Sequence, residues 1–440
     1  MKLGALAIYI VLIQIGYLFN SFALSFLPMI LMGFTSMKIL EKSNLSFLKL
    51  VNINKNLLLF ALVGSIALIR TNYIGISFVM SAIQVINLIL FIYCFTLICN
   101  VEMKRNDANS YRVIITYLLT PFLLLAVTNF VLYFLGISLT QSQLGEESGT
   151  YQAILLSYIG IDITRVEFPL AGGLNNYASY VGAVFMINIA LIMMLEKKSN
   201  LLRASAVVFF ITLLLIDTRS SIIYPLLILL CLYLIRNKRR LSKGLKFVSL
   251  FVVVGPLLFT VLLPLVSSLP GFEFLERGDN DLQTGNARFF IWLFAFAEFM
   301  SFKPIHIFGW GDYGHFGSGV SKNWTSMFQG WANSEYKTPH NTMLSLIFDY
   351  GYIGLILYIS VIWQSIERLR YIWDKKPIVA KSLYTFVLYN IITGVTEVLG
   401  GFYFPNYILL FYMVTIIINV QYYLLKRQEN VDKLVLLPNL

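Results

Sequence analysis

The chain has 440 residues, of which 58% are hydrophobic and only 12% are charged, and its formal net charge is +11. This composition excludes a soluble enzyme, whose surface carries a larger charged fraction. The basic residues lie in short segments between long apolar runs, so the positive charge does not indicate a nucleic-acid partner. The three cysteines (Cys94, Cys99 and Cys231) lie inside apolar runs and indicate neither a disulfide framework nor a metal site.

The apolar runs have nearly the length needed to cross a hydrocarbon core about 30 Å thick, which is about 20 residues. They predict an all-α polytopic membrane protein with about 12 transmembrane helices in a single membrane domain, residues 1–440. The predicted spans are 3–19, 21–37, 56–70, 74–99, 113–136, 174–195, 201–216, 220–235, 247–268, 341–364, 378–397 and 405–425. The first span follows Lys2 as a signal peptide would, but no small-residue cleavage site is clear, which favours a retained helix.

The distribution of basic residues predicts which side of the membrane each loop occupies. Lys and Arg concentrate in the cytoplasmic loops of membrane proteins. Placing both termini in the cytoplasm puts most of the 33 basic residues on that side. The opposite side then receives eight: Arg70, Arg165, Arg219, Arg277, Arg288, Lys303, Lys322 and Lys337. We therefore expect both termini to be cytoplasmic.

Two of the predicted outer loops are long, whereas every inner loop is short. The first covers about 137–173 and the second covers 269–340. A chain that places its long extramembrane segments on one face is expected to carry out its chemistry there. The second loop is predicted to be partly helical and to carry part of the active site. No internal repeat is visible, which counts against a transporter built on repeats.

Two arginines on the outer side are candidates for binding phosphate. Arg219 lies in the short hairpin 217–221 between two spans, and Arg288 begins an amphipathic run whose next turn adds Trp292. A guanidinium binds phosphate through two parallel hydrogen bonds and stays charged at any biological pH. The alternative is that each arginine reaches lipid headgroups at the interface, or that Arg219 pairs with Asp217.

His340 lies where the second long loop meets a predicted helix. Thr338 suits an N-cap and Pro339 suits the first helical position, so His340 is predicted to lie in the first turn. The unpaired N–H groups there form an anion site. A neutral histidine beside it could accept a proton from an attacking hydroxyl or bind a phosphate oxygen. A capping or packing histidine is the alternative, and His306 and His315 are interpreted in that way.

The remaining polar features are interpreted as supporting ones. The segment 309–314 matches the spacing G-x-G-x-x-G, but it follows no buried strand, so it predicts a tight turn and not a dinucleotide site. Its Trp310 and Tyr313 fit an interfacial belt or sugar-stacking platforms equally well. Asp349 is expected to face the protein interior and to orient a partner, and Glu397 is a weaker candidate of the same kind.

Together these residues resemble the core of the bacterial O-antigen polymerase and O-antigen ligase superfamily (Wzy/WaaL-like proteins). The resemblance covers roughly 165–365, while the first five predicted spans match in topology alone. The matching features are Arg288 with Trp292, Pro304 with the Gly-rich turn, His340-Asn341 followed after nine residues by Gly351-x-x-Gly354, the hairpin Thr218-Arg219-Ser220, and Asn175-Asn176.

The resemblance implies a metal-independent glycosyltransferase of the membrane-embedded GT-C type that needs no cofactor. Its donor would be a glycan on undecaprenyl pyrophosphate, presented at the periplasmic face of the bacterial inner membrane. Arg219 and Arg288 would hold the pyrophosphate as it leaves, and His340 would assist at the acceptor hydroxyl or at the leaving phosphate. Further substrate-binding residues would be Arg165, Asn176, Trp292 and Asn341.

Polymerase and ligase differ in the acceptor of the glycan. A polymerase would use the next lipid-linked repeat unit, and a chain-length regulator would be a further partner. A ligase would use the lipid A core. We prefer the polymerase because Arg165 offers a further cation for a second polyprenyl-linked substrate. A flippase or transporter of lipid-linked sugars would need polar residues along a central path, and a non-catalytic scaffold would not need Arg219, Arg288 and His340 to converge.

Overall fold

The structure is a computed structural model, and it describes residues 3–19, 21–40, 46–137, 153–196, 199–234, 238–267, 288–328, 334–400 and 405–436. Over these residues the chain is all-helical, as the apolar runs predict. Parts of both long predicted loops, 138–152 in the first and 269–287 and 329–333 in the second, lie outside the described residues.

The long helices are α1 (Leu3–Phe19), α2 (Phe22–Leu40), α4 (Lys55–Ile69), α5 (Phe78–Arg105), α7 (Thr120–Phe134), α9 (Leu174–Met194), α10 (Asn200–Ile216), α11 (Arg219–Leu234), α12 (Lys238–Ser267), α14 (Arg288–Phe299), α17 (Thr342–Lys375), α18 (Pro377–Thr393) and α19 (Pro405–Leu436). The short elements are α3 (Phe47–Ile53), η1 (Asp107–Asn109), α6 (Tyr111–Ile114), the π-helical turn η2 (Ile115–Leu119), α8 (Ile154–Ser157), α15 (Ile305–Phe308), α16 (Gly314–Gly317), η5 (Val320–Asn323), η6 (Thr325–Phe328) and η7 (Ser334–Tyr336).

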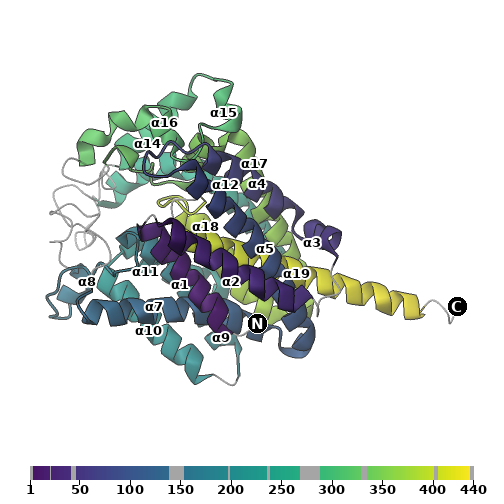
Figure 1. Cartoon of the computed structure of the whole chain (residues 1–440). Helices are drawn as coiled ribbons and strands as arrows, with labels where there is room; N and C mark the ends of the chain where they lie inside the picture. Colours follow the sequence, from purple (N-terminus) through teal and green to yellow (C-terminus); the bar gives the residue numbers. More distant parts are fainter. Residues whose placement is uncertain are drawn as a thin grey trace.

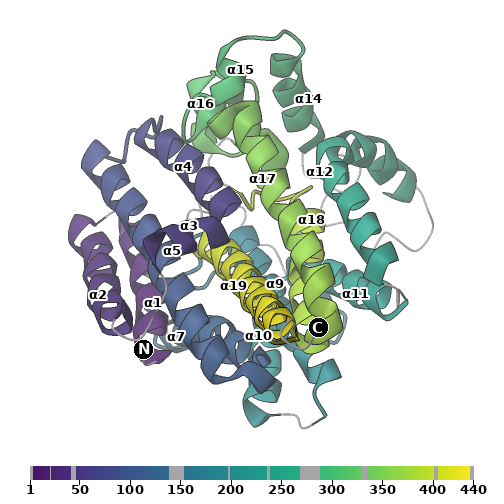
Figure 2. The ribbon, with the colours of Figure 1, turned by 90° about the vertical axis from the view of Figure 1, so that its right-hand side faces the viewer.

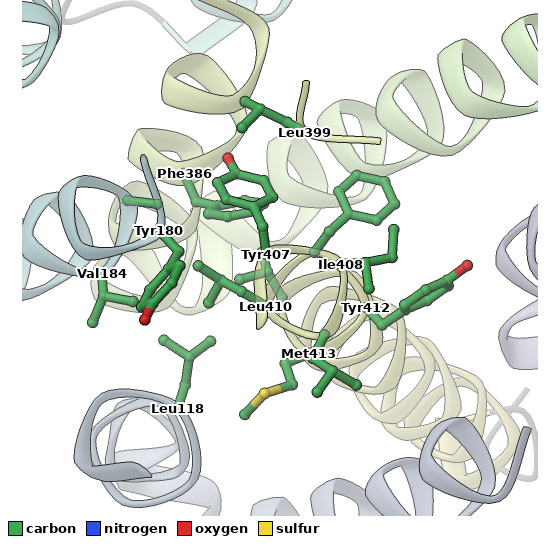
Figure 3. Close-up of a cluster of buried hydrophobic side chains, with 14 of the residues drawn as sticks. Leu118, Tyr180, Val184, Phe386, Leu399, Tyr407, Ile408, Leu410, Tyr412 and Met413 are labelled. Carbon is green, nitrogen blue, oxygen red and sulfur yellow. The ribbon is translucent and has the colours of Figure 1, made fainter. Parts of the chain in front are cut away.

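Helix α19 lies at the centre of the bundle (Figures 1 and 2). Every residue from Tyr407 to Gln421 is buried, and the helix packs against α1, α5, α9 and α17. Figure 3 shows side chains of α9, α18 and η2, among them Tyr180, Phe386 and Leu118, around this helix. A helix that is apolar on all sides is expected inside a membrane bundle. Beyond the bundle, its C-terminal end projects to the right in Figure 1.

Peripheral helices expose apolar side chains in stripes three or four residues apart. Such stripes are unfavourable in water, whereas hydrocarbon is a suitable solvent for them. On α4 and α11 the exposed residues are Leu59, Leu62, Ile66, Ile69, Ile223, Leu226, Leu227 and Leu230. The chain is therefore a multi-pass membrane protein.

Each of the predicted spans overlaps a helix or consecutive helices. Among the described residues, five segments are long and apolar enough to cross a membrane, or six if α3 and α4, which meet at 88°, form one broken span. The five are α5, Tyr111–Phe134, α9, α17 and Tyr407–Asp432. Other apolar helices, such as α10, have only 10–17 residues. The count of about 12 spans and the cytoplasmic position of both termini therefore stay predictions.

Helix α17 is interrupted at Gly351, where φ is 69° and ψ is −171°. The Gly-rich segment 309–314 forms a tight turn that docks in this interruption. Gly311 N–H donates to the Asp349 carbonyl over 3.1 Å, and the Asp349 carboxylate accepts from Gly314 N–H over 2.7 Å. Asp349 thus orients the turn from inside the protein, where its side chain is fully buried.

Candidate active site

Helix α14 carries Arg288 at its N-terminal end, as the amphipathic run predicts. Trp292, one turn further along, is buried, and its Nε1–H donates to the Pro339 carbonyl over 2.9 Å. This bond ties α14 to the residue immediately before His340. Because both ends of the bond are buried, the relative position of Arg288 and His340 is set by packing and not by the loop between them.

The start of α17 differs from the prediction. Thr338 does not cap the helix, because Asn341 is the N-cap and its Oδ1 accepts from Leu344 N–H over 2.9 Å. Asparagine is among the best N-cap residues. The preceding His340 has a left-handed φ of 49°, which turns the chain and prevents a helix from beginning earlier. His340 therefore lies just outside the helix N-terminus and not in its first turn.

A turn after α18 places Glu397 beside this N-terminus. The predicted span 378–397 runs past the helix, which ends at Thr393, because the following residues fold back onto the start of α17. Asn341 Nδ2 donates to two carbonyls of this turn over 2.9 and 3.4 Å. Thr342 Oγ1 donates to the Glu397 carbonyl over 2.8 Å. The Asn341 side chain is thus fully used in joining the turn to α17.

Arg288, His340 and Glu397 meet to form what we call the charged cluster. Glu397 Oε1 lies 2.7 Å from Arg288 Nη2, and Glu397 Oε2 lies 3.9 Å from His340 Nδ1. The side chains are 17%, 24% and 9% exposed for Arg288, His340 and Glu397. The guanidinium and the imidazole are therefore partly accessible, whereas the carboxylate between them is buried.

The charged cluster controls the protonation of its two titratable groups, which lie outside the membrane-spanning helices. Burial opposes the charge of Glu397, but Arg288 and His340 outweigh it and lower the pKa of Glu397 below its ordinary value. Burial lowers the pKa of His340 below its ordinary 6.5, Arg288 and Lys337 lower it further, and Glu397 opposes them. At neutral pH Glu397 is an anion, and His340 is a neutral base.

Helix α11 is a fourth segment near the charged cluster. Arg219 is its first residue, and the Arg219 side chain lies outside the part of the structure that is described. Further along α11, Tyr224 OH lies 3.3 Å from Thr396 Oγ1, next to Glu397. Five residues of helix rise about 7.5 Å, so the backbones of Arg219 and Tyr224 lie less than two turns apart along α11. The predicted convergence is therefore observed for Arg288 and His340, and for Arg219 it stays a prediction.

Arg165 contacts the hairpin that leads into α11, and Asn176 follows Asn175, whose Oδ1 lies 3.5 Å from Thr218 Oγ1 of the same hairpin. Arg165 Nε–H donates to the Ile216 carbonyl over 2.9 Å, and its Nη2 donates to Thr218 Oγ1 over 3.4 Å. Asn176, in the first turn of α9, is 9% exposed, and its Oδ1 has no hydrogen-bond partner among the described residues. The described part of the first long loop, 153–173, is thus packed against the Arg219 hairpin, while the roles of Arg165 and Asn176 toward a substrate stay predictions.

The other two histidines are buried in the packing of the second long loop. His306 contacts the rings of Phe299 and Trp310, with centroid separations of 5.0 and 5.2 Å. His315 Nε2 lies 3.1 Å from the Tyr336 carbonyl, and burial lowers the pKa of His315 to about 4. Both rings are fully buried, in agreement with the packing interpretation.

Sequence reasoning gave Glu397 little weight and missed Tyr224 and Thr396. Glu397 is the last residue of a predicted span and lies far from His340 along the chain, so no local pattern joins it to the other two members of the charged cluster. The signal that was available is an acid at the outer end of an apolar run, which requires a partner. Nothing in the sequence marks Tyr224 or Thr396 apart from their position near span ends.

The fold and the charged cluster define a multi-pass membrane protein with a partly buried cation and base at the ends of its helices. Residues 204–359 match the family model described as O-Antigen ligase, which confirms the predicted resemblance to the O-antigen polymerase and ligase superfamily. The match includes Arg219, Arg288, His340 and Asn341, and Glu397 lies beyond it. The chain has no match among curated proteins and none among solved structures.

Proposed function

We propose that the chain is a surface-polysaccharide polymerase. It transfers a glycan from undecaprenyl pyrophosphate to the next lipid-linked repeat unit at the periplasmic face of the inner membrane. The observation that carries this proposal is the charged cluster, where a guanidinium and a neutral imidazole flank one buried carboxylate. A guanidinium suits a diphosphate and a neutral imidazole suits a hydroxyl proton. The family match supports the same class of enzyme.

In the proposed reaction the acceptor hydroxyl oxygen attacks the anomeric carbon of the donor glycan. The bond from that carbon to the pyrophosphate oxygen breaks, and its electron pair stays on the diphosphate. Arg288 and Arg219 stabilise this developing charge, which is the largest catalytic contribution expected at such a site. His340 accepts the hydroxyl proton. The products are the extended glycan, inverted at the anomeric carbon, and undecaprenyl pyrophosphate.

The second candidate is a ligase that transfers the finished chain to the lipid A core, which the description of the matched family favours. Arg165 favours the polymerase, since it adds a cation beside the hairpin of Arg219 for the diphosphate of a lipid-linked acceptor. Polymerase and ligase then share the charged cluster and differ in how the acceptor is held.

The glycan profile of a deletion strain distinguishes the two candidates. We expect core lipid bearing a single repeat unit, because a lost polymerase leaves unextended units for ligation. Long chains that remain on the polyprenyl carrier would identify a ligase. Surface polysaccharide of normal length and amount would contradict both. Complementation with the intact chain is the control for effects on neighbouring genes.

The rate of transfer should depend on pH through His340. The neutral imidazole is the active form, and its pKa is lowered from 6.5, so kcat/KM should be constant near pH 7. Activity should fall only below pH 6.5, as His340 gains a proton. Initial rates of the purified enzyme across this range test the prediction. His306→Gln should keep the same profile, and a decline that begins above pH 7 would exclude His340 as the base.

A further inference from the structure

Glu397 contacts both groups to which the proposed function gives a role. One carboxylate oxygen pairs with Arg288 and the other faces His340 Nδ1. Glu397 itself lies outside the residues that match the family model, so the match assigns it nothing. A carboxylate that touches a phosphate-binding cation and a base at once can couple the occupancy of one to the reactivity of the other.

The Arg288–Glu397 pair must change when a diphosphate arrives. The 2.7 Å contact occupies a nitrogen of the guanidinium that a bidentate phosphate contact would use. The incoming diphosphate also places negative charge near the Glu397 anion, and like charges at this distance in a buried site repel. The donor and Glu397 therefore compete for Arg288.

The alternative partner for Glu397 is close. Oε2 already lies 3.9 Å from His340 Nδ1, so an approach of about 1 Å reaches hydrogen-bond distance. The backbone does not need to move: Glu397 N–H donates to the Thr393 carbonyl over 2.9 Å, and the Glu397 carbonyl accepts from Thr342 Oγ1. A rotation of the side chain on this fixed backbone is enough to change partners.

We propose that Glu397 is a donor-responsive positioning residue. It holds Arg288 in the free enzyme, and when the diphosphate of the donor takes over the guanidinium, it hydrogen-bonds to His340 Nδ1–H. That bond orients the imidazole and leaves Nε2 free to accept the acceptor's proton. This inference rests on the proposed function, because it assigns Glu397 to the same diphosphate and the same base.

The change of partner strengthens the base when it is needed. A carboxylate on one ring nitrogen fixes the tautomer and raises the basicity of the other. In the free enzyme, Arg288 and burial keep the pKa of His340 low. Neutralising Arg288 with a diphosphate removes one of these effects, and the Glu397 carboxylate, which already opposes them, moves closer to the ring. The titratable and charged groups that interact electrostatically with His340 or Glu397 are Arg288 on α14, Lys337 after η7, His315 on α16, Tyr224 on α11 and Tyr389 on α18.

The variant Glu397→Gln, made in the full-length enzyme, tests separately whether Glu397 competes with the donor for Arg288 and whether it orients His340. Binding is measured with undecaprenyl pyrophosphate, and turnover with the lipid-linked glycan that accumulates in the deletion strain. Undecaprenyl pyrophosphate should bind about 3- to 10-fold more tightly, because Arg288 loses its competing anion. Turnover (kcat) should fall about 10- to 100-fold, because His340 loses its orienting partner. A purely structural defect would weaken binding and lower kcat together. Tighter binding with a lower kcat therefore identifies Glu397 as the link between Arg288 and His340.

Glu397→Asp keeps the charge on a shorter side chain, so it should change both quantities in the same directions but less. If Glu397→Gln does not fold, the binding and kcat of Glu397→Asp test the proposed role of Glu397 instead. Glu298 provides a matched control, because its carboxylate pairs with Lys303 and faces His306 at 3.6 Å, outside the charged cluster. Glu298→Gln should leave binding and kcat unchanged.

Unchanged or weaker binding of undecaprenyl pyrophosphate by Glu397→Gln would overturn the inference, as would an unchanged kcat. Failure of the proposed function has a different signature. If Arg288→Ala binds undecaprenyl pyrophosphate as well as the unmodified chain does, the diphosphate site itself is wrongly placed. If Arg288→Ala loses binding but Glu397→Gln does not gain it, only the inference about Glu397 fails.

Discussion

Replacing Arg288 or His340 with alanine is expected to abolish chain transfer while the protein still inserts into the membrane. In the proposed mechanism Arg288→Ala removes a fixed positive charge from the leaving diphosphate, and the loss of one such stabilising group costs about 100- to 1000-fold in kcat. It also leaves the buried Glu397 without its 2.7 Å partner. His340→Ala removes the proposed proton acceptor, which should lower kcat about 100- to 10,000-fold. The surface glycan of complemented deletion cells should contain no long chains.

Matched variants show whether these losses belong to the site. Lys303→Ala removes a cation that follows α14 and pairs with Glu298, and His306→Gln alters a histidine that packs among aromatic rings. Neither residue contacts the charged cluster, so chain length and amount should stay normal in both. Full-length surface polysaccharide in cells that express Arg288→Ala or His340→Ala at the normal level would remove the proposed mechanism.

Gly351→Ala is expected to have the second large effect, on folding and not on chemistry. Gly351 has a φ of 69°, which side chains other than glycine rarely adopt. An added Cβ would lie 2.3 Å from the Ile307 carbonyl oxygen and 2.6 Å from Gly309 N. Both atoms belong to the backbone, so the Gly-rich turn would have to leave the interruption of α17. We expect a loss of more than about 2 kcal/mol of stability and little folded protein.

Gly319→Ala is the control that shows how much of the stability loss in Gly351→Ala comes from the clash with the backbone of Ile307 and Gly309. Gly319 also has a positive φ, of 79°, but no atom lies within 4 Å of an added Cβ. Its substitution should therefore cost only the backbone strain, about 1 kcal/mol. Thermal unfolding of the purified proteins, followed by size-exclusion chromatography, compares the two. Equal melting temperatures for both variants would mean that the turn does not depend on docking at Gly351.

The sequence made the helical class of this protein predictable, and with it the face of α14 that carries Arg288 and Trp292. Both depend on local patterns: the length of an apolar run and the spacing of buried residues along one helix. The family resemblance could also be drawn from the sequence, because His340-Asn341 and the glycines of α17 form a local pattern of residues close together in the chain. The residue at which α17 begins could not be predicted, because Thr338 and Asn341 are both good N-cap residues. The turn at His340 decides between them.

What the sequence determined by itself is that the chain is a helical membrane protein that resembles the O-antigen polymerases and ligases, with Arg288 and His340 as candidate site residues. Only the tertiary structure decided that a buried carboxylate joins these two residues. The Arg288–Glu397 pair spans 109 positions of the sequence. It exists because the segment after α18 folds back and is held by Asn341 and Thr342. A contact made by the return of a distant turn leaves no periodic pattern in the sequence, since its cause is the packing of helices and not the order of residues.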